Sequence, residues 1–232
     1  MRERVVLVTG GTGFLGQAVV RHFLEAGARV VVPWVAQAEA ERLREQTAEG
    51  ARLTLIEASV TDPAGADAIV AACREAGVLQ VAVLLVGGFA MQPIHETERS
   101  TWDRMWTLNA TSVFQVAHHV LPLLRETGGG RVITVAAEPA LDRGAPGMAA
   151  YAATKSAVVS FTQSMAREGA EYGVTANAVA PRIIDTPANR EAMPDADTST
   201  WLAPEAIAQV IGFLAGPEAG IVTGNVLTLS LG

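Results

Sequence analysis

Short runs rich in β-branched residues alternate with helix-like segments along this chain. The candidate strands are residues 5–9, 29–32, 52–58, 81–87, 131–137, 174–180 and 225–230. The helical segments lie near residues 14–26, 37–47, 64–76, 101–124, 151–171 and 204–215. Several runs are apolar at successive positions, as strands of a parallel sheet are when helices cover both faces. This alternation predicts an α/β fold with a doubly wound parallel sheet of about seven strands between two helical layers.

The composition fits one globular domain. Of the 232 residues, 50% are hydrophobic and 18% are charged, so a large core can form and we do not expect disorder. This length suffices for one α/β domain and is short for two, and no linker divides the chain. We therefore expect a single domain over residues 1–232.

Charge and hydropathy exclude several kinds of partner. The net charge is −7 and no run of Lys or Arg occurs, which speaks against nucleic acid and anionic membrane surfaces. The chain enters a strand at once, leaving no room for a signal peptide, and no apolar run has the length of a membrane span. The one cysteine, Cys73, lies in an apolar-periodic stretch that indicates a buried thiol. We expect a cytoplasmic protein.

The first turn after a strand is rich in glycine. It reads TGGTGFLG, with Gly10, Gly13 and Gly16 at three-residue spacing before a helix. Such a turn lets a pyrophosphate approach free N–H groups at a helix N-terminus, although glycine also collects in purely structural turns. At this position we expect dinucleotide binding. The expected contacts from this turn are Gly10, Thr12, Gly13, Phe14, Leu15 and Gly16.

The end of the second strand leaves the choice of dinucleotide open. The sequence there is VVVPWVAQ, with no acidic residue to bind the adenosine ribose and no arginine to bind a 2′-phosphate. The cofactor is therefore NAD or NADP. Trp34 is a candidate for contact with the adenosine and equally for ordinary packing.

Four motifs occur in a characteristic order. They are the glycine turn, Asn109 in TLNATSVF, Tyr151-x-x-x-Lys155, and NAVAP followed by TP at residues 177–187. From about residue 4 to 231 the chain resembles the short-chain dehydrogenase/reductase family. The resemblance implies a Rossmann-type fold, NAD or NADP, a small-molecule substrate, and a homodimer or homotetramer. It also implies that Tyr151 is the proton donor and that Lys155 binds the nicotinamide ribose and lowers the pKa of the tyrosine.

The same resemblance implies roles for further residues. Asn109 would help to hold a proton-relay water, and Thr186 would contact the nicotinamide carboxamide. The other implied cofactor contacts are Trp34, Ser59, Val60, Val86, Gly87, Gly88, Tyr151, Lys155, Pro181 and Ile184. No His, Cys or carboxylate spacing indicates a metal site.

Elementary chemistry agrees with the roles of the tyrosine and the lysine. An unperturbed phenol, with a pKa of about 10, is poorly matched to neutral pH, and a nearby ammonium favours its ionised form. Residues 151 and 155 share one helical face, so one amine can serve both the phenol and a cofactor. The alternative is a surface lysine one turn from a packing tyrosine.

The chain departs from the family pattern at several positions. The family serine falls near residues 137–138, where this chain has Ala137 and Glu138, and the usual glycine after NAVAP is Arg182. Loss of one preorganised donor costs about 10²–10³ in rate. A quinonoid substrate would suffer less, because it regains aromaticity on reduction. Glu138 is a candidate for substrate contact or an ordinary solvated carboxylate.

A second, partial resemblance points to the same substrate class. The stretches ALDRGAPGMAAYAATKSAV and DTPANREAMPDADTSTW resemble the dihydropteridine reductase branch, which carries alanine at the serine position. The polar segment at about 182–203 is long enough to be a lid over the nicotinamide. We expect an NAD(P)-dependent oxidoreductase acting on a carbonyl or quinonoid substrate. The alternative is a weakened nucleotide-binding sensor or scaffold.

Overall fold

Seven strands form one parallel sheet. The computed structural model describes residues 4–141 and 145–231. The strands are β1 (Val5–Thr9), β2 (Arg29–Trp34), β3 (Leu53–Glu57), β4 (Leu79–Leu84), β5 (Gly130–Val135), β6 (Val174–Pro181) and β7 (Val226–Leu229). Their order is β3-β2-β1-β4-β5-β6-β7, and each neighbouring pair is parallel. The order reverses between β1 and β4, the point at which doubly wound folds bind dinucleotides.

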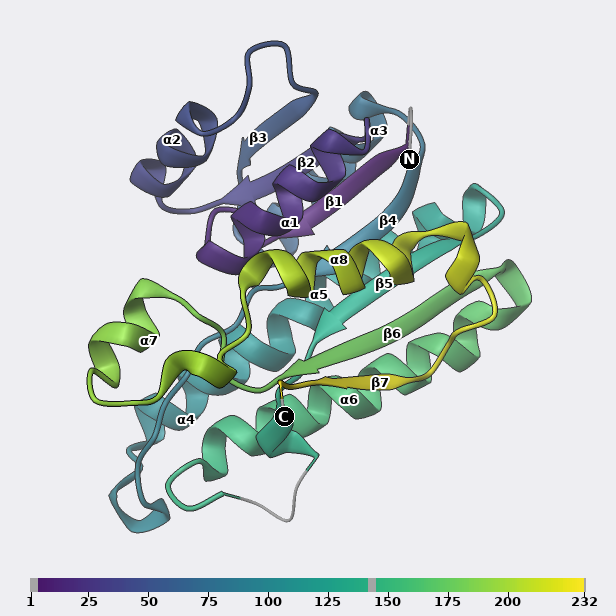
Figure 1. The fold of residues 1–232 in the computed structure, drawn as a ribbon. Coiled ribbons are helices and arrows are strands. Elements are labelled where there is room, and N and C mark those ends of the chain that lie inside the picture. The colour runs from purple at the N-terminus through teal and green to yellow at the C-terminus, as the bar shows by residue number, and fades with distance from the viewer. Residues whose placement is uncertain (1–3, 142–144, 232) are drawn as a thin grey trace.

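Helices cover both faces of the sheet. They are α1 (Phe14–Glu25), α2 (Gln37–Glu45), α3 (Pro63–Ala76), α4 (Arg99–Met105), α5 (Ser112–Glu126), α6 (Ala149–Gly169), α7 (Pro187–Ala192) and α8 (Pro204–Ala215). Short 3-10 turns are η1 (Ile94–Glu96), η3 (Glu138–Ala140), η4 (Ala170–Tyr172), η5 (Thr198–Thr200) and η6 (Pro217–Ala219). A π-helical segment, η2 (Trp106–Thr111), joins α4 to α5. Helices α1 and α8 pack together on one face, and α3, α5 and α6 cover the other (Figure 1). The predicted three-layer Rossmann-type fold is confirmed.

The central strands divide their side chains between two buried layers. Val5 and Leu7 of β1 belong to the layer beneath α3, α5 and α6, whereas Val6 and Val8 belong to the layer beneath α1 and α8. This is the period of two that a strand imposes, with apolar residues needed on both faces. The core therefore fixes the sheet, and its carboxyl edge is free to carry polar groups.

Three predicted segments differ in detail. The predicted strand 81–87 is β4 at Leu79–Leu84, and residues 85–87 lie in the loop that follows. The predicted helix 101–124 is α4, η2 and α5 in succession. The predicted substrate loop at 182–203 contains α7 and η5, because Thr186 accepts a hydrogen bond from the N–H of Asn189 as N-cap and a proline follows it. A bridge between Ile184 and Leu202 ties the ends of the segment together.

Cys73 is buried and unpaired, as predicted. Across residues 4–141 and 145–231, no helix combines the length and the apolar character needed to traverse a bilayer.

Candidate active site

Lys155 is the only lysine in the chain, and it is buried. Its Nζ donates a 2.7 Å hydrogen bond to the carbonyl oxygen of Val135, the last residue of β5. Burial lowers the pKa of this amine to about 8, because the interior disfavours the charged form. The amine is thus fixed at the carboxyl edge of the sheet and is still mostly protonated at neutral pH.

Tyr151 lies one helical turn before Lys155 on α6. Its ring packs edge-on against Phe89, with ring centroids 5.0 Å apart. Burial raises the pKa of the phenol to about 12. In the free protein desolvation dominates the pKa of this phenol and the amine donates to Val135, so the expected lowering by Lys155 stays a prediction. At neutral pH the phenol keeps its proton, as a proton donor must.

Asn109 lies fully buried within the π-helical segment η2. Its Oδ1 accepts a 2.8 Å hydrogen bond from the N–H of Gly88, and its Nδ2 donates to the carbonyl of Gly88 at 3.1 Å and to the hydroxyl of Thr154 at 3.0 Å. Thr154 Oγ1 in turn donates to the carbonyl of Tyr151. Asn109 therefore joins the loop after β4 to the first turn of α6. Because both Nδ2 hydrogens are used, this side chain could hold a relay water only through Oδ1.

The loop after β4 carries no side chain where it passes Asn109 and Lys155. A Cβ added to Gly87 would lie 2.7 Å from Asn109 Oδ1 and 3.1 Å from Lys155 Nζ. A Cβ on Gly88 would lie 2.8 Å from Leu108 Cδ1. The backbone from Val86 to Gly88 can therefore approach a bound ligand closely, as the family pattern implies for these residues.

The glycine turn forms a cradle for an anion. Gly10 has a φ of +69° and its carbonyl accepts from the N–H of Gly13 at 3.1 Å. A Cβ on Gly16 would collide with the carbonyl oxygen of Gly10. Helix α1 then begins at Phe14, which Leu15 follows. It has no side-chain cap at its N-terminus and no acidic residue in its first turn. Its first N–H groups are thus available to an anion, so these residues fit a dinucleotide pyrophosphate.

A carboxylate that the sequence did not reveal stands beside this cradle. Glu39 of α2 accepts a 2.8 Å hydrogen bond from the hydroxyl of Thr12. The expected adenosine contacts lie at the ends of the neighbouring strands: Trp34 closes β2, and Ser59 follows β3 with its hydroxyl 2.8 Å from that of Thr61. Val60 is buried. Glu39 escaped prediction because it lies in the helix after β2 and not at the end of that strand.

The expected nicotinamide contacts follow β6 at the same edge of the sheet. Pro181 ends β6 and is buried, and Ile184 pairs with Leu202. Thr186 accepts the cap hydrogen bond of α7 through its oxygen, which leaves the hydroxyl proton free to be donated. Phe89 and Met91, in the loop after β4, are exposed, whereas Trp201 is buried.

Two departures from the family pattern meet in the structure. Ala137 is buried, whereas the half-buried carboxylate of Glu138 lies 3.4 Å from Nε of Arg182. Val135 of β5 pairs with Val179 of β6. Glu138 follows Val135 by three residues and Arg182 follows Val179 by three residues, so the two side chains leave neighbouring strands at the same level. The sequence showed both departures and did not show that they form one ion pair.

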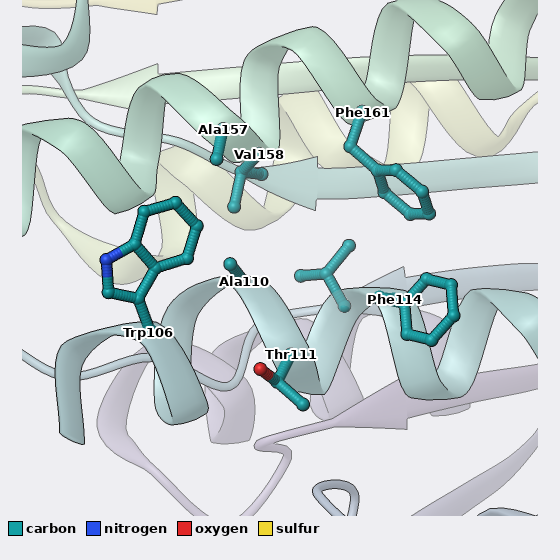
Figure 2. A pocket seen from close by; sticks show the side chains of 8 residues that line it. Trp106, Ala110, Thr111, Phe114, Ala157, Val158 and Phe161 are labelled. Carbon is teal, nitrogen blue, oxygen red and sulfur yellow. The ribbon is translucent and has the colours of Figure 1, made fainter. Parts of the chain in front are cut away.

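Two apolar hollows lie near helix α6. One is lined by Ile94, Thr97, Arg99, Trp102, Ala149 and Ala150, the last two of which directly precede Tyr151 in the chain. The other lies between η2–α5 and α6, and Figure 2 shows side chains from both sides facing it. Its lining is Trp106, Ala110, Thr111, Val113, Phe114, Ala157, Val158 and Phe161. The second hollow contains none of the expected catalytic or cofactor residues. Within the described part of the chain, no three His, Cys, Asp or Glu side chains gather as metal ligands would.

Comparison with known proteins places this arrangement in a family. Residues 4–197 match the family model for the short chain dehydrogenases. The chain belongs to the short-chain dehydrogenase family. It is 31% identical to the 3-oxoacyl-acyl-carrier-protein reductase FabG of Vibrio cholerae, over 100% of this chain and 98% of that protein. It is 32% identical to the cyclic-di-GMP-binding biofilm dispersal mediator protein of Escherichia coli, over 97% of this chain and 95% of that protein.

A solved structure shows the same fold with a nucleotide. An actinorhodin polyketide ketoreductase solved with NADPH superposes with a TM-score of 0.87 at 28% identity, over 97% of this chain and 95% of that one. This short-chain dehydrogenase is therefore an NAD(P)-dependent oxidoreductase, as predicted. The individual roles of the site residues and the likeness to the dihydropteridine reductase branch stay predictions.

Proposed function

We propose that this short-chain dehydrogenase reduces a carbonyl or quinonoid group of a small molecule, with Tyr151 as proton donor. One arrangement carries the proposal. The protonated phenol of Tyr151 and the buried amine of Lys155 stand on one helix, and the bare backbone of Gly87 passes the amine.

The cofactor would lie along the carboxyl edge of the sheet. The first turn of α1, from Gly13 to Gly16, would hold the pyrophosphate, and Lys155 would donate to the ribose hydroxyls. Thr186 would donate to the carboxamide. When bound, the nicotinamide supplies the hydride.

The chain's own contribution to the chemistry is a proton. Because the pKa of Tyr151 is raised to about 12, the phenol is protonated at the start and can donate to the oxygen that gains negative charge. The ammonium of Lys155, one turn away, would stabilise the phenolate that remains. The raised pKa suits reduction better than oxidation, which needs the phenolate at the start.

The segment at 182–203 would close over the substrate. It follows β6 at the nicotinamide side, and its two ends are held together by the Ile184–Leu202 bridge and by the hydrogen bond from the N–H of Asp185 to the carbonyl of Leu202. A segment anchored at both ends can move as a unit, which suits a lid. Apolar parts of a substrate would enter the hollow beside Tyr151 that Ile94 and Trp102 line.

A second candidate is a nucleotide-binding sensor or scaffold with little turnover. The absence of the serine at Ala137 and Glu138 favours it, and one relative of similar identity carries the name of a cyclic-di-GMP-binding mediator. The difference between the two candidates is turnover and not nucleotide binding.

The test is fluorescence titration with NADH and NADPH, followed by turnover of a panel of ketones, quinones and quinonoid dihydropterin. We expect micromolar nucleotide binding, measurable reduction, and a loss of about 10²–10⁴ in rate for Tyr151→Phe with nucleotide affinity unchanged. Tight binding without turnover on the whole panel would establish the sensor instead.

The hollow between η2–α5 and α6, shown in Figure 2 and called the groove below, would be an interface of the expected homodimer or homotetramer. None of its lining residues is charged, and Phe114 at its rim is 51% exposed. An uncharged apolar surface of this kind favours a protein partner, and a second copy presents the same surface to it.

A further inference from the structure

The ion pair between Glu138 and Arg182 lies at the reactive edge of the sheet. Val135, three residues before Glu138, accepts the hydrogen bond of Lys155 Nζ. A strand rises about 3.3 Å per residue, so the Cα of Glu138 lies within about 10 Å of the Cα of Val135, the residue that holds the amine. The backbone of Arg182 is fixed, because its backbone N–H donates to the carbonyl of Leu229 on β7 at 3.0 Å.

Arg182 has unused capacity to bind an anion. Its nearest contact with Glu138 joins Nε to Oε2 at 3.4 Å, and its side chain is 48% exposed. In the described part of the chain its two Nη groups donate no hydrogen bond, which leaves four of the five N–H groups of the guanidinium available. A partly exposed ion pair of this length contributes little to stability. The pair is therefore poorly explained as a structural brace.

The other donors near Lys155 are already committed. Both amide hydrogens of Asn109 bind the protein, and in the proposed function Tyr151 donates to the reacting oxygen. Among the residues that the structure describes, the guanidinium is thus a cation near the site that still has donors to offer. Its planar fork matches the two oxygens of a carboxylate.

Resting on the proposed function, we propose that Arg182 binds a carboxylate on the substrate and that Glu138 is a positioning residue for it. The substrate class is then an oxo acid, with the acid group a few bonds away from the carbonyl that is reduced. Glu138 keeps the guanidinium at the site when no substrate is present. When the substrate binds, its carboxylate either displaces Glu138 from Arg182 or binds Arg182 alongside it.

The test compares an oxo acid with its neutral ester in the NADH-loaded protein. The probes are 4-oxopentanoate and its methyl ester, together with the corresponding 2- and 3-oxo acids and esters. We expect at least one acid to exceed its ester in kcat/KM by about tenfold. Arg182→Gln should lower kcat/KM for that acid about ten- to hundredfold, mainly through KM, and change the ester less than threefold. Arg74→Gln is the matched control, since Arg74 forms an exposed pair with Glu126 on α5.

Variants of Glu138 test the positioning role. Glu138→Ala should raise KM for the acid and leave kcat and the ester unchanged, and Glu138→Gln, which keeps an acceptor for Arg182, should restore KM. Thermal unfolding verifies that each variant is folded. Equal losses for acid and ester in Arg182→Gln, or no loss in either, would overturn the proposal.

A binding measurement separates this proposal from the proposed function. Saturation-transfer NMR with pentanoate and pentanol needs no turnover. If pentanoate binds the wild type and not Arg182→Gln while no carbonyl compound is reduced, the carboxylate site stands and the reductase assignment fails. If neutral ketones are reduced and pentanoate binds no better than pentanol, the reductase stands and the carboxylate site is wrong.

Discussion

The hydroxyl of Thr12 donates a 2.8 Å hydrogen bond to the carboxylate of Glu39, joining the glycine turn to helix α2. This carboxylate stands where a dinucleotide would leave the cradle toward its adenosine. A 2′-phosphate there would meet like charge, whereas a free ribose hydroxyl could donate to it. We therefore expect NADH to bind more tightly than NADPH, a choice that the end of β2 left open.

Glu39→Gln should shift this preference. We expect NADPH affinity to rise about three- to tenfold, the effect of roughly 1 kcal/mol of relieved repulsion, with NADH affinity nearly unchanged. Fluorescence titration of both nucleotides measures the ratio. Glu41→Gln on the same helix is the control and should leave it alone. A wild-type protein that binds NADPH more tightly would contradict this reading.

Nucleotide affinity should weaken above pH 8 because the pKa of Lys155 is lowered to about 8. The protonated amine is the binding form, so the Kd for NADH should rise by up to about tenfold per pH unit above that value. Since Lys155 is the only lysine, a protein labelled with ¹³Cε-lysine gives one side-chain NMR resonance. Its midpoint should lie near 8 in the free protein, and a midpoint near 10.5 would show that the amine is not desolvated.

The same shift affects stability, with a defined sign. The folded-state pKa of about 8 lies below the ordinary 10.5, so the unfolded chain binds more protons between these values. Stability from this group therefore rises as pH increases from about 8 to 10.5. Lys155→Met should remove that rise in denaturant unfolding curves measured across the window.

Gly87→Ala should damage the site more than the fold. The added Cβ would lie 2.7 Å from Asn109 Oδ1 and 3.1 Å from Lys155 Nζ, so one of these groups must move. We expect NADH affinity to fall more than tenfold, with about 1–3 kcal/mol lost in stability. Gly50→Ala has nothing within 4 Å of the new Cβ and should leave NADH affinity intact despite its strained backbone. Equal affinities in the two variants would show that the clearance at Gly87 does not matter.

Phe114→Glu should separate a homo-oligomer if the groove in Figure 2 is its interface. Phe114 is 51% exposed and its ring lies 6.1 Å from that of Phe161 across the groove. Size-exclusion chromatography with light scattering should report a smaller species than the wild type at equal concentration. Ile221→Glu, at a side chain 96% exposed, should not change the mass. Dissociation of the Ile221 variant alone would place the interface elsewhere.

The fold was predictable because apolar strands and intervening helices leave a periodic pattern in the sequence. The pairing of Tyr151 with Lys155 was predictable for the same reason, since a spacing of four places both on one helical face. The contacts between Thr12 and Glu39 and between Glu138 and Arg182 were not, because they depend on which strands and helices become neighbours. The raised pKa of Tyr151 was not predictable either. Its cause is burial, and burial is set by tertiary packing against residues such as Phe89.

The π-helical segment Trp106–Thr111 has a consequence for how the outer helices are oriented. A turn that holds an extra residue rotates everything after it by about 100° relative to a regular α-helix. Asn109 in this turn points inward to Gly88, while Phe114, five residues later on α5, lines the groove. Removing a single residue from this turn would rotate the whole of α5 about its axis. The position of Asn109 in the site and the position of Phe114 on the groove therefore depend on the same irregular turn.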